Sequence, residues 1–194
     1  MLIMNCNSWL RIVSVLLTLP IISVQSQTPR ITPAVLDGSL AEYKLVWHDE
    51  FDGKAVNPNN WNYRTGERFW STQRPENVSV SDGKLRIALK KEKLGNTDYT
   101  AGGLISKREF KFGYYEARLK MPRGKGWHTS FWLMRNGDDR DQELDVCEQD
   151  SINPHDYSTN IHAYKPAHKT LGAKHIATPD LTTDFHVWGC EFTP

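Results

Sequence analysis

The chain of 194 residues lacks an excess of charge of either sign. It has 24 Lys and Arg against 23 Asp and Glu. Arg11 is the one charged residue among the first 26 positions, so the remainder is balanced. Proteins that bind polyanions through bulk electrostatics carry a clear excess of basic residues. The balance therefore argues against a nucleic-acid-binding protein.

Cysteines are also scarce, with three in the chain. Cys6 lies in an N-terminal segment that we expect to be removed, which leaves Cys147 and Cys190. Two cysteines do not make a disulfide framework, and the sequence leaves open whether they pair. The histidines show no zinc-binding spacing. We therefore expect neither a metal nor a cofactor at the functional site.

The one long apolar run, residues 12–22, lies near the N-terminus and follows Arg11. A basic residue, an apolar run and small residues before a cleavage point are the pattern of a secretory signal peptide. The run is too short to span a bilayer and contains Pro20, which argues against a transmembrane anchor. We expect residues 1–26 to be cleaved and the mature protein to be secreted, extracellular or periplasmic, without membrane attachment.

Beyond a Pro-containing linker or N-terminal arm at residues 27–44, apolar residues recur with a period of two. In residues 84–90, for example, Leu85, Ile87 and Leu89 alternate with mostly basic residues, as expected for a half-buried strand. No window of a dozen residues shows a helical stripe. The sequence predicts an all-β, largely antiparallel sandwich. The predicted strands are 45–51, 76–80, 84–90, 103–112, 115–121, 129–135, 143–149, 158–163 and 185–192.

Residues 141–150 combine acidic residues with the apolar residues of a strand. In an ideal strand Glu143 and Asp145 share one face and Glu148 lies on the other. A β-bulge that adds one residue between Asp145 and Glu148 would bring all three carboxylates to one face. The glutamate carboxyl groups could then approach the roughly 5.5 Å separation of a retaining glycosidase. The pattern by itself leaves open a solvated acidic edge or a divalent-cation site.

Such an arrangement suits glycoside hydrolysis. One carboxylate must be ionised to attack the sugar carbon, and another must hold a proton for the leaving oxygen. A third acid between them couples their titrations and helps to keep the acid protonated near neutral pH.

Residues 143–148 resemble the Glu-x-Asp-x-x-Glu signature of glycoside hydrolase family 16. The resemblance covers residues 45–194 and implies a catalytic domain with a concanavalin-like β-jelly roll of two curved antiparallel sheets. The family's domain normally continues beyond the last of these segments, so we expect a partial domain, truncated at its C-terminus. The other segments that resemble the family, in the same order, are 47–53, 103–107, 112–118, 126–134 and 185–194.

The resemblance implies a role for each acid of the run. Glu143 would be the nucleophile, Glu148 the general acid/base and Asp145 the assisting carboxylate. Some family members carry a structural calcium ion, but its ligands are not recognisable in this sequence. The residues expected to bind substrate are Trp132, which would stack on the sugar, and Trp127, His162, Arg74 and Asn77.

The resemblance further implies a retaining endo-glycoside hydrolase that cleaves a β-linked polysaccharide, either β-glucan or β-galactan, by double displacement. We expect it to act as a monomer. Two alternatives stay open, namely a non-catalytic carbohydrate-binding protein of the same fold and a transglycosylase. Related binding proteins typically lack the catalytic glutamates, so the presence of all three acids favours an enzyme. The balanced charge gives no reason to prefer a sulfated polymer over an uncharged one.

Overall fold

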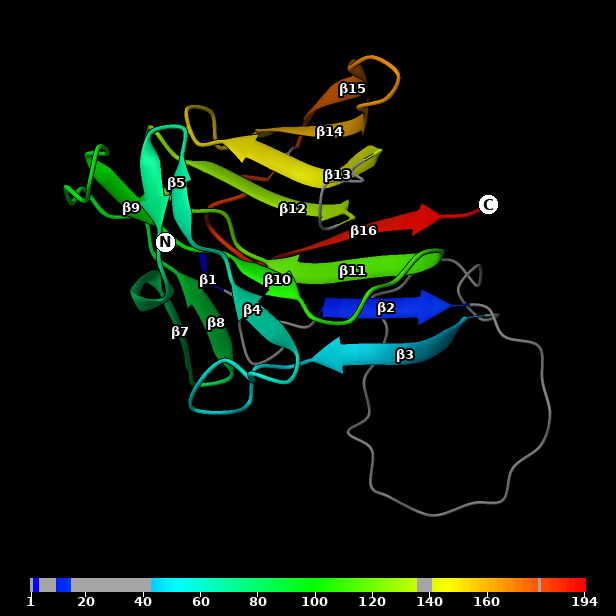
Figure 1. Cartoon of the computed structure of the whole chain (residues 1–194), viewed down its shortest axis with the longest axis horizontal. Coiled ribbons are helices and arrows are strands. Elements are labelled where there is room, and N and C mark those ends of the chain that lie inside the picture. Colours follow the sequence, from blue (N-terminus) through cyan, green and yellow to red (C-terminus); the bar gives the residue numbers. More distant parts are fainter. Residues whose placement is uncertain (1, 4–9, 15–42, 136–140, 178) are drawn as a thin grey trace.

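The computed structural model describes residues 2–3, 10–14, 43–135, 141–177 and 179–194, and this part of the chain is built almost entirely of β-strands (Figure 1). The one helical element described is a short 3₁₀ turn, η2 (Pro75–Asn77). The structure thus confirms the predicted all-β fold. The strands are β1 (Leu2–Ile3), β2 (Leu10–Ser14), β3 (Lys44–Asp49), β4 (Trp61–Tyr63), β5 (Gly66–Arg68), β6 (Ser71–Gln73), β7 (Val78–Ser81), β8 (Lys84–Ile87), β9 (Tyr99–Ala101), β10 (Leu104–Ser106), β11 (Gly113–Leu119), β12 (His128–Met134), β13 (Gln142–Asp150), β14 (Asp156–Ala163), β15 (Lys169–Ile176) and β16 (His186–Phe192).

Two antiparallel four-stranded sheets form the bulk of the fold. One has the strand order β12-β13-β14-β15 and the other the order β16-β11-β2-β3. The two sheets meet where β13 contacts β16. Three small sheets, β1-β8-β7, β10-β4 and β5-β6-β9, extend beyond them, and Figure 1 shows β5 and β9 near the ends of β12 and β13.

The hydrophobic core takes side chains from both large sheets and from the small ones. Burial of these residues from water is the main favourable contribution to folding, at roughly 25 cal/mol per Å² of apolar surface. The core thereby fixes which face of β13 turns inward. Its buried members are Phe51, Val56, Trp61, Val78, Val80, Leu85, Ala117, Leu119, Met121, Val146, Cys147, Leu181 and Trp188.

Each of the nine predicted strands overlaps an observed one, although residues 103–112 contain only the short strand β10. The turn at Asp82 and Gly83 links β7 and β8, and both residues have positive φ, 52° and 60°, as a two-residue hairpin turn requires. The sequence did not predict β4, β5, β6 and β9, because three residues are too few to show a period. It also did not predict β15, whose residues are mostly exposed and carry no apolar alternation.

The predicted signal peptide and linker fall largely outside the described residues. Of the signal segment the structure describes residues 2–3 and 10–14, and β2 pairs with β11 on one side and β3 on the other. Cleavage of this segment stays a prediction. Among the described residues no helix is long and apolar enough to cross a membrane.

Both described cysteines are free thiols, which answers the question that the sequence left open. Cys147 is fully buried in the core and Cys190 is partly buried. Burial raises the pKa of both thiols, that of Cys190 to about 11. Neither thiol therefore has the thiolate character of a nucleophilic cysteine.

Asn77 lies in the core at the end of η2 and not at a surface that substrate could reach. Its side chain is buried, and Nδ2 donates hydrogen bonds to Thr100 Oγ1 at 2.8 Å and to the Ala101 carbonyl at 3.0 Å. The expectation that Asn77 binds substrate is therefore not supported. Its amide instead ties η2 to β9.

Replacing Asn77 by Ala should lower the free energy of unfolding by about 1–3 kcal/mol, because the buried Thr100 hydroxyl and Ala101 carbonyl would lose their donor. Urea unfolding measures this loss. Asn59→Ala, at an exposed position, is the matched control. Equal stability of the two variants would contradict the structural role of Asn77.

Candidate active site

A β-bulge in β13 sets the geometry of the acidic strand. Against β12, Trp132 pairs with Asp145 and Phe131 with Cys147, so Val146 is the extra residue. Against β14, the register shifts between Asp145 and Glu148 as well. This is the bulge that the spacing of the acids predicts. Because strand side chains alternate between faces, the added residue returns Glu148 to the face of Glu143 and Asp145.

Both oxygens of Glu148 are held by hydrogen-bonding partners. Asn160 Nδ2 on β14 donates to Oε2 at 2.7 Å, and His128 Nε2 on β12 lies 3.0 Å from Oε1. Gly172 on β15 pairs with Asn160, and a Cβ at that position would lie 2.2 Å from Asn160 Oδ1. The absence of a side chain at Gly172 therefore leaves room for Asn160 to reach Glu148.

Asp145 is the most enclosed of the three acids, with its side chain 1% exposed. Its Oδ2 lies 3.1 Å from His162 Nε2, and among the described residues Oδ1 has no hydrogen-bond partner. Burial, together with the charges of Glu148 and Glu143, raises the pKa of Asp145 to about 6. Asp145 is thus neutral in mildly acidic solution, where three adjacent negative charges would otherwise repel one another.

His162 positions Asp145 from the neighbouring strand. Its second ring nitrogen, Nδ1, lies 2.8 Å from Thr170 Oγ1 and 3.4 Å from His168 Nε2. The ring is therefore fixed between Asp145 and β15. The predicted role of His162 in substrate binding stays a prediction, and the structure gives it a contact with Asp145.

Glu143 has a different set of neighbours. The Tyr164 hydroxyl donates a hydrogen bond to Glu143 Oε2. Burial, followed by the charge of Arg68, lowers the pKa of Arg64. The negative charge of Glu143 acts in the opposite direction, which shows that Glu143 lies near Arg64. The Arg64 guanidinium also lies 5.0 Å from the centre of the Trp132 ring. A hydroxyl donor and a guanidinium thus lie at this end of the site, near Glu143.

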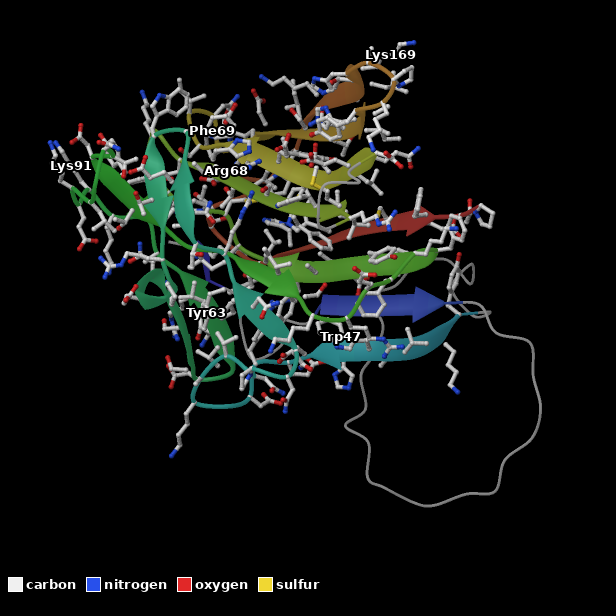
Figure 2. The ribbon with its side chains drawn as sticks, in the orientation of Figure 1. Trp47, Tyr63, Arg68, Phe69, Lys91 and Lys169 are labelled. Carbon is white, nitrogen blue, oxygen red and sulfur yellow. The ribbon has the colours of Figure 1, made fainter. Side chains whose placement is uncertain are left out.

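The β5–β6 hairpin adds exposed aromatic residues beside Arg64. Arg68 lies near Arg64, and its guanidinium is 5.5 Å from the Phe69 ring centre (Figure 2). Phe69 and Trp70 form the hairpin turn, and each is 83% exposed. Exposed rings of this size can stack on the flat faces of sugars.

The structure brings some predicted substrate-binding residues to the acids and places others elsewhere. Trp132 faces the same side as Asp145, its partner across the strands. Trp127 precedes β12 and contacts the ring of Tyr99 edge-on, with centres 6.5 Å apart. Arg74 forms ion pairs with Glu76 and Glu92, at 2.8 and 3.4 Å. Among the described residues, the hydrogen bonds and ion pairs of Arg74 go to Glu76 and Glu92 and to none of the three acids, and its role with substrate stays a prediction.

Sequence reasoning missed several residues that contact the acids. The alternation of side chains along a strand indicates two of them. His128 shares a face with Trp132, and Asn160 shares a face with His162. Arg64 and Tyr164 lie at strand ends, where the alternation gives no such signal. In the described part of the chain no group of three or more His, Cys, Asp or Glu side chains is arranged to hold a metal ion.

Three carboxylates lie on one face of a strand, and the outer two have unlike surroundings, as glycoside hydrolysis by two carboxyl groups requires. A family model agrees with this geometry, since "Glycosyl hydrolases family 16" matches residues 65–194. The chain belongs to glycoside hydrolase family 16, and its fold is the concanavalin-like β-jelly roll of that family.

Individual relatives support the same assignment. The chain is 30% identical to a β-glucanase of Rhodothermus marinus over 172 residues, which cover 78% of this chain and 60% of the relative. It is 29% identical to β-porphyranase E of Zobellia galactanivorans over 170 residues, or 73% and 59% of the two chains. The laminarinase catalytic domain of Thermotoga maritima superposes with a TM-score of 0.71 at 27% identity, over 77% of this chain and 70% of that one. The chain thus spans about 60% of the length of these two sequence relatives.

The burial of Asp145 yields a prediction about stability and pH. Because its pKa in the folded protein, about 6, lies above the unfolded value, its contribution to stability is present at low pH and is lost as the pH rises through 6. Asp145→Asn keeps the shape but cannot ionise. The melting temperature of this variant, relative to the parent, should therefore rise between about pH 4 and pH 6.5 and then stay level.

Asp98→Asn, at an exposed aspartate, is the control and should show no such trend. If the difference in melting temperature between Asp145→Asn and the parent stays constant over this pH range, the pKa of Asp145 is not raised.

Proposed function

We propose that the protein is a retaining endo-glycoside hydrolase that cleaves β-linked polysaccharide by double displacement. The observation that carries the proposal is the bulge in β13, which places Glu143, Asp145 and Glu148 on one face. The different neighbours of the two glutamates support different roles for them. Tyr164 and Arg64 lie near Glu143, while His128 and Asn160 contact Glu148.

In the first half of the reaction, the Glu143 carboxylate attacks the anomeric carbon of the sugar. The bond from that carbon to the glycosidic oxygen breaks, and its electron pair stays with the oxygen. Glu148 donates its proton to this oxygen, so the departing chain leaves as an alcohol. The product of this step is an ester between the sugar and Glu143.

In the second half, Glu148 acts as a base. It takes a proton from a water molecule, and the water oxygen attacks the anomeric carbon. The ester bond breaks, and Glu143 is released as a carboxylate. Two inversions give net retention of the anomeric configuration. Asp145, which is neutral in mildly acidic solution, lies between the two glutamates and limits the repulsion between them.

The names of the relatives support a β-glucan or a β-galactan as the substrate. The Rhodothermus relative is a β-glucanase, the Thermotoga structure is a laminarinase and the Zobellia relative is a porphyranase. The residues Arg64, Arg68, Phe69 and Trp70, which we call the hairpin wall, support a polymer that extends past the cleaved bond. We further propose that the protein is secreted after cleavage of residues 1–26, as their sequence pattern indicates.

A reducing-sugar assay on laminarin, mixed-linkage glucan, agar, porphyran and carrageenan tests the activity. We expect hydrolysis of at least one of the β-linked polymers. Glu143→Gln should lower that rate roughly a thousandfold or more, because an amide cannot form the ester. Glu109→Gln, at an exposed glutamate, should keep the parent's rate.

NMR of the first product tests the stereochemistry, and a β-anomer is expected at the outset. A Glu143→Gln variant as active as the parent, or an initial α-anomer, would show that the roles of the acids are wrong. Binding of polysaccharide with no hydrolysis by the parent would instead indicate a carbohydrate-binding protein.

The hairpin wall predicts a dependence on substrate length. Phe69→Ala and Trp70→Ala should each lower kcat/KM on the polymer by about tenfold, the value of one lost stacking contact. They should have little effect on a short aryl glycoside, which does not reach the hairpin. Ile152→Ala removes another highly exposed apolar side chain, in the turn after β13, and is the control. An equal loss on polymer and short substrate would argue against the wall as a binding surface.

A further inference from the structure

His128 lies between two carboxylates. Nε2 is 3.0 Å from Glu148 Oε1, and Nδ1 is 2.9 Å from Asp150 Oδ1. The strand pairing sets this position, because His128, at the start of β12, pairs with Asp150 at the end of β13. Glu148 is two residues before Asp150 and faces the same side. The ring therefore bridges both acids.

Two carboxylates on opposite sides of one imidazole restrict its protonation. A neutral imidazole has one N–H and one lone pair, so it can donate to only one of two ionised neighbours. Both contacts are satisfied when the ring carries two protons, or when Glu148 holds a proton and donates it to Nε2. These two states differ only in the position of one proton along a 3.0 Å hydrogen bond.

We propose that His128 and Glu148 share this proton, and that His128 is a positioning residue that keeps it available to the general acid. The inference rests on the proposed role of Glu148 and extends it to a residue outside the three acids. In the first half-reaction the pair gives up its proton to the glycosidic oxygen, which leaves a neutral ring and an ionised Glu148. In the second half-reaction the pair regains a proton from the attacking water.

The surroundings of His128 favour retention of this proton well above neutral pH. The charged groups that face the ring are Glu148 and Asp150, both on β13. β12 is the edge strand of its sheet, so β13 is its one neighbour there. The hydrogen bond to Glu148, opposed by burial and aided by Asp150, raises the pKa of His128 to about 9. Two further residues lie next to Glu148. Asp145 and Glu148 interact as like charges, and Asn160, which is uncharged, donates a hydrogen bond to Glu148.

Asp150 fixes the orientation of the ring. With Nδ1 bonded to this exposed carboxylate, Nε2 is the nitrogen left to face Glu148. A group that orients a histidine in this way also sets which nitrogen exchanges the proton. Loss of Asp150 should therefore weaken the effect of His128 without removing it.

The first test is the pH dependence of kcat/KM for His128→Gln, whose amide cannot exchange a proton. The alkaline limb should move down by about one pH unit or more, so that activity near pH 9 falls about tenfold relative to the parent. Near pH 6 the two should agree within about threefold. Asp150→Asn should shift the limb in the same direction by a smaller amount.

The matched control is His155→Gln, because His155 bonds the Pro179 carbonyl and does not contact the acids. This variant should keep the parent's profile. A uniform fall in the activity of His128→Gln at every pH would show a purely structural role and would overturn the proposal.

The second test does not depend on turnover. NMR titration of labelled histidine, with the His128 signal assigned by its loss in His128→Gln, should give a midpoint near 9 in the parent. In Glu148→Gln the midpoint should fall by about one pH unit or more, because the partner charge is gone. If the midpoint of His128 is the same in Glu148→Gln as in the parent, the shared proton is wrong. If the midpoint shifts but the parent hydrolyses none of the polymers, only the proposed function is wrong.

Discussion

The active-site geometry depends on one backbone feature, the bulge at Val146 in β13. Without the extra residue, a strand that carried Glu143 and Asp145 on one face would turn Glu148 into the core. With it, Val146 and Cys147 are both buried, 6% and 0% exposed, while the acids on either side point to the opposite face. The core therefore holds the bulge in place, since reversing it would expose two apolar side chains and bury a carboxylate.

The bulge aligns the acids, and the neighbouring strands give each one its own environment. β14 supplies Asn160 to Glu148 and His162 to Asp145, while Tyr164, just after β14, reaches Glu143. β15 contributes through a missing side chain, because Gly172 leaves space for Asn160. β15 is mostly exposed and has little apolar alternation, but its pairing with β14 places Gly172 where the Asn160 side chain needs space.

The sequence predicted those parts of the fold that have a period or a distinctive spacing. The alternation in residues 84–90 and 115–121 predicted β8 and β11, and the spacing of the acids predicted the bulge itself. It did not predict β15 or the three-residue strands, because neither short nor exposed strands need alternating side chains. The contacts of Arg64 and Tyr164 depend on how strand ends come together in space. Asn77 shows another limit, since a polar residue in a loop-like segment is buried and hydrogen-bonded within the core, which its sequence does not indicate.

The balanced net charge conceals an uneven distribution along the acidic face. At one end Arg64 lies near Glu143 and Arg68, so positive charge gathers there. At the other end Glu148 contacts His128, and the second ring nitrogen of His128 contacts Asp150. Double displacement requires this asymmetry, because one glutamate must begin the reaction as an anion and the other as an acid. The two glutamates of this strand differ in their surroundings because β12 gives His128 to Glu148 and the segment after β4 brings Arg64 near Glu143.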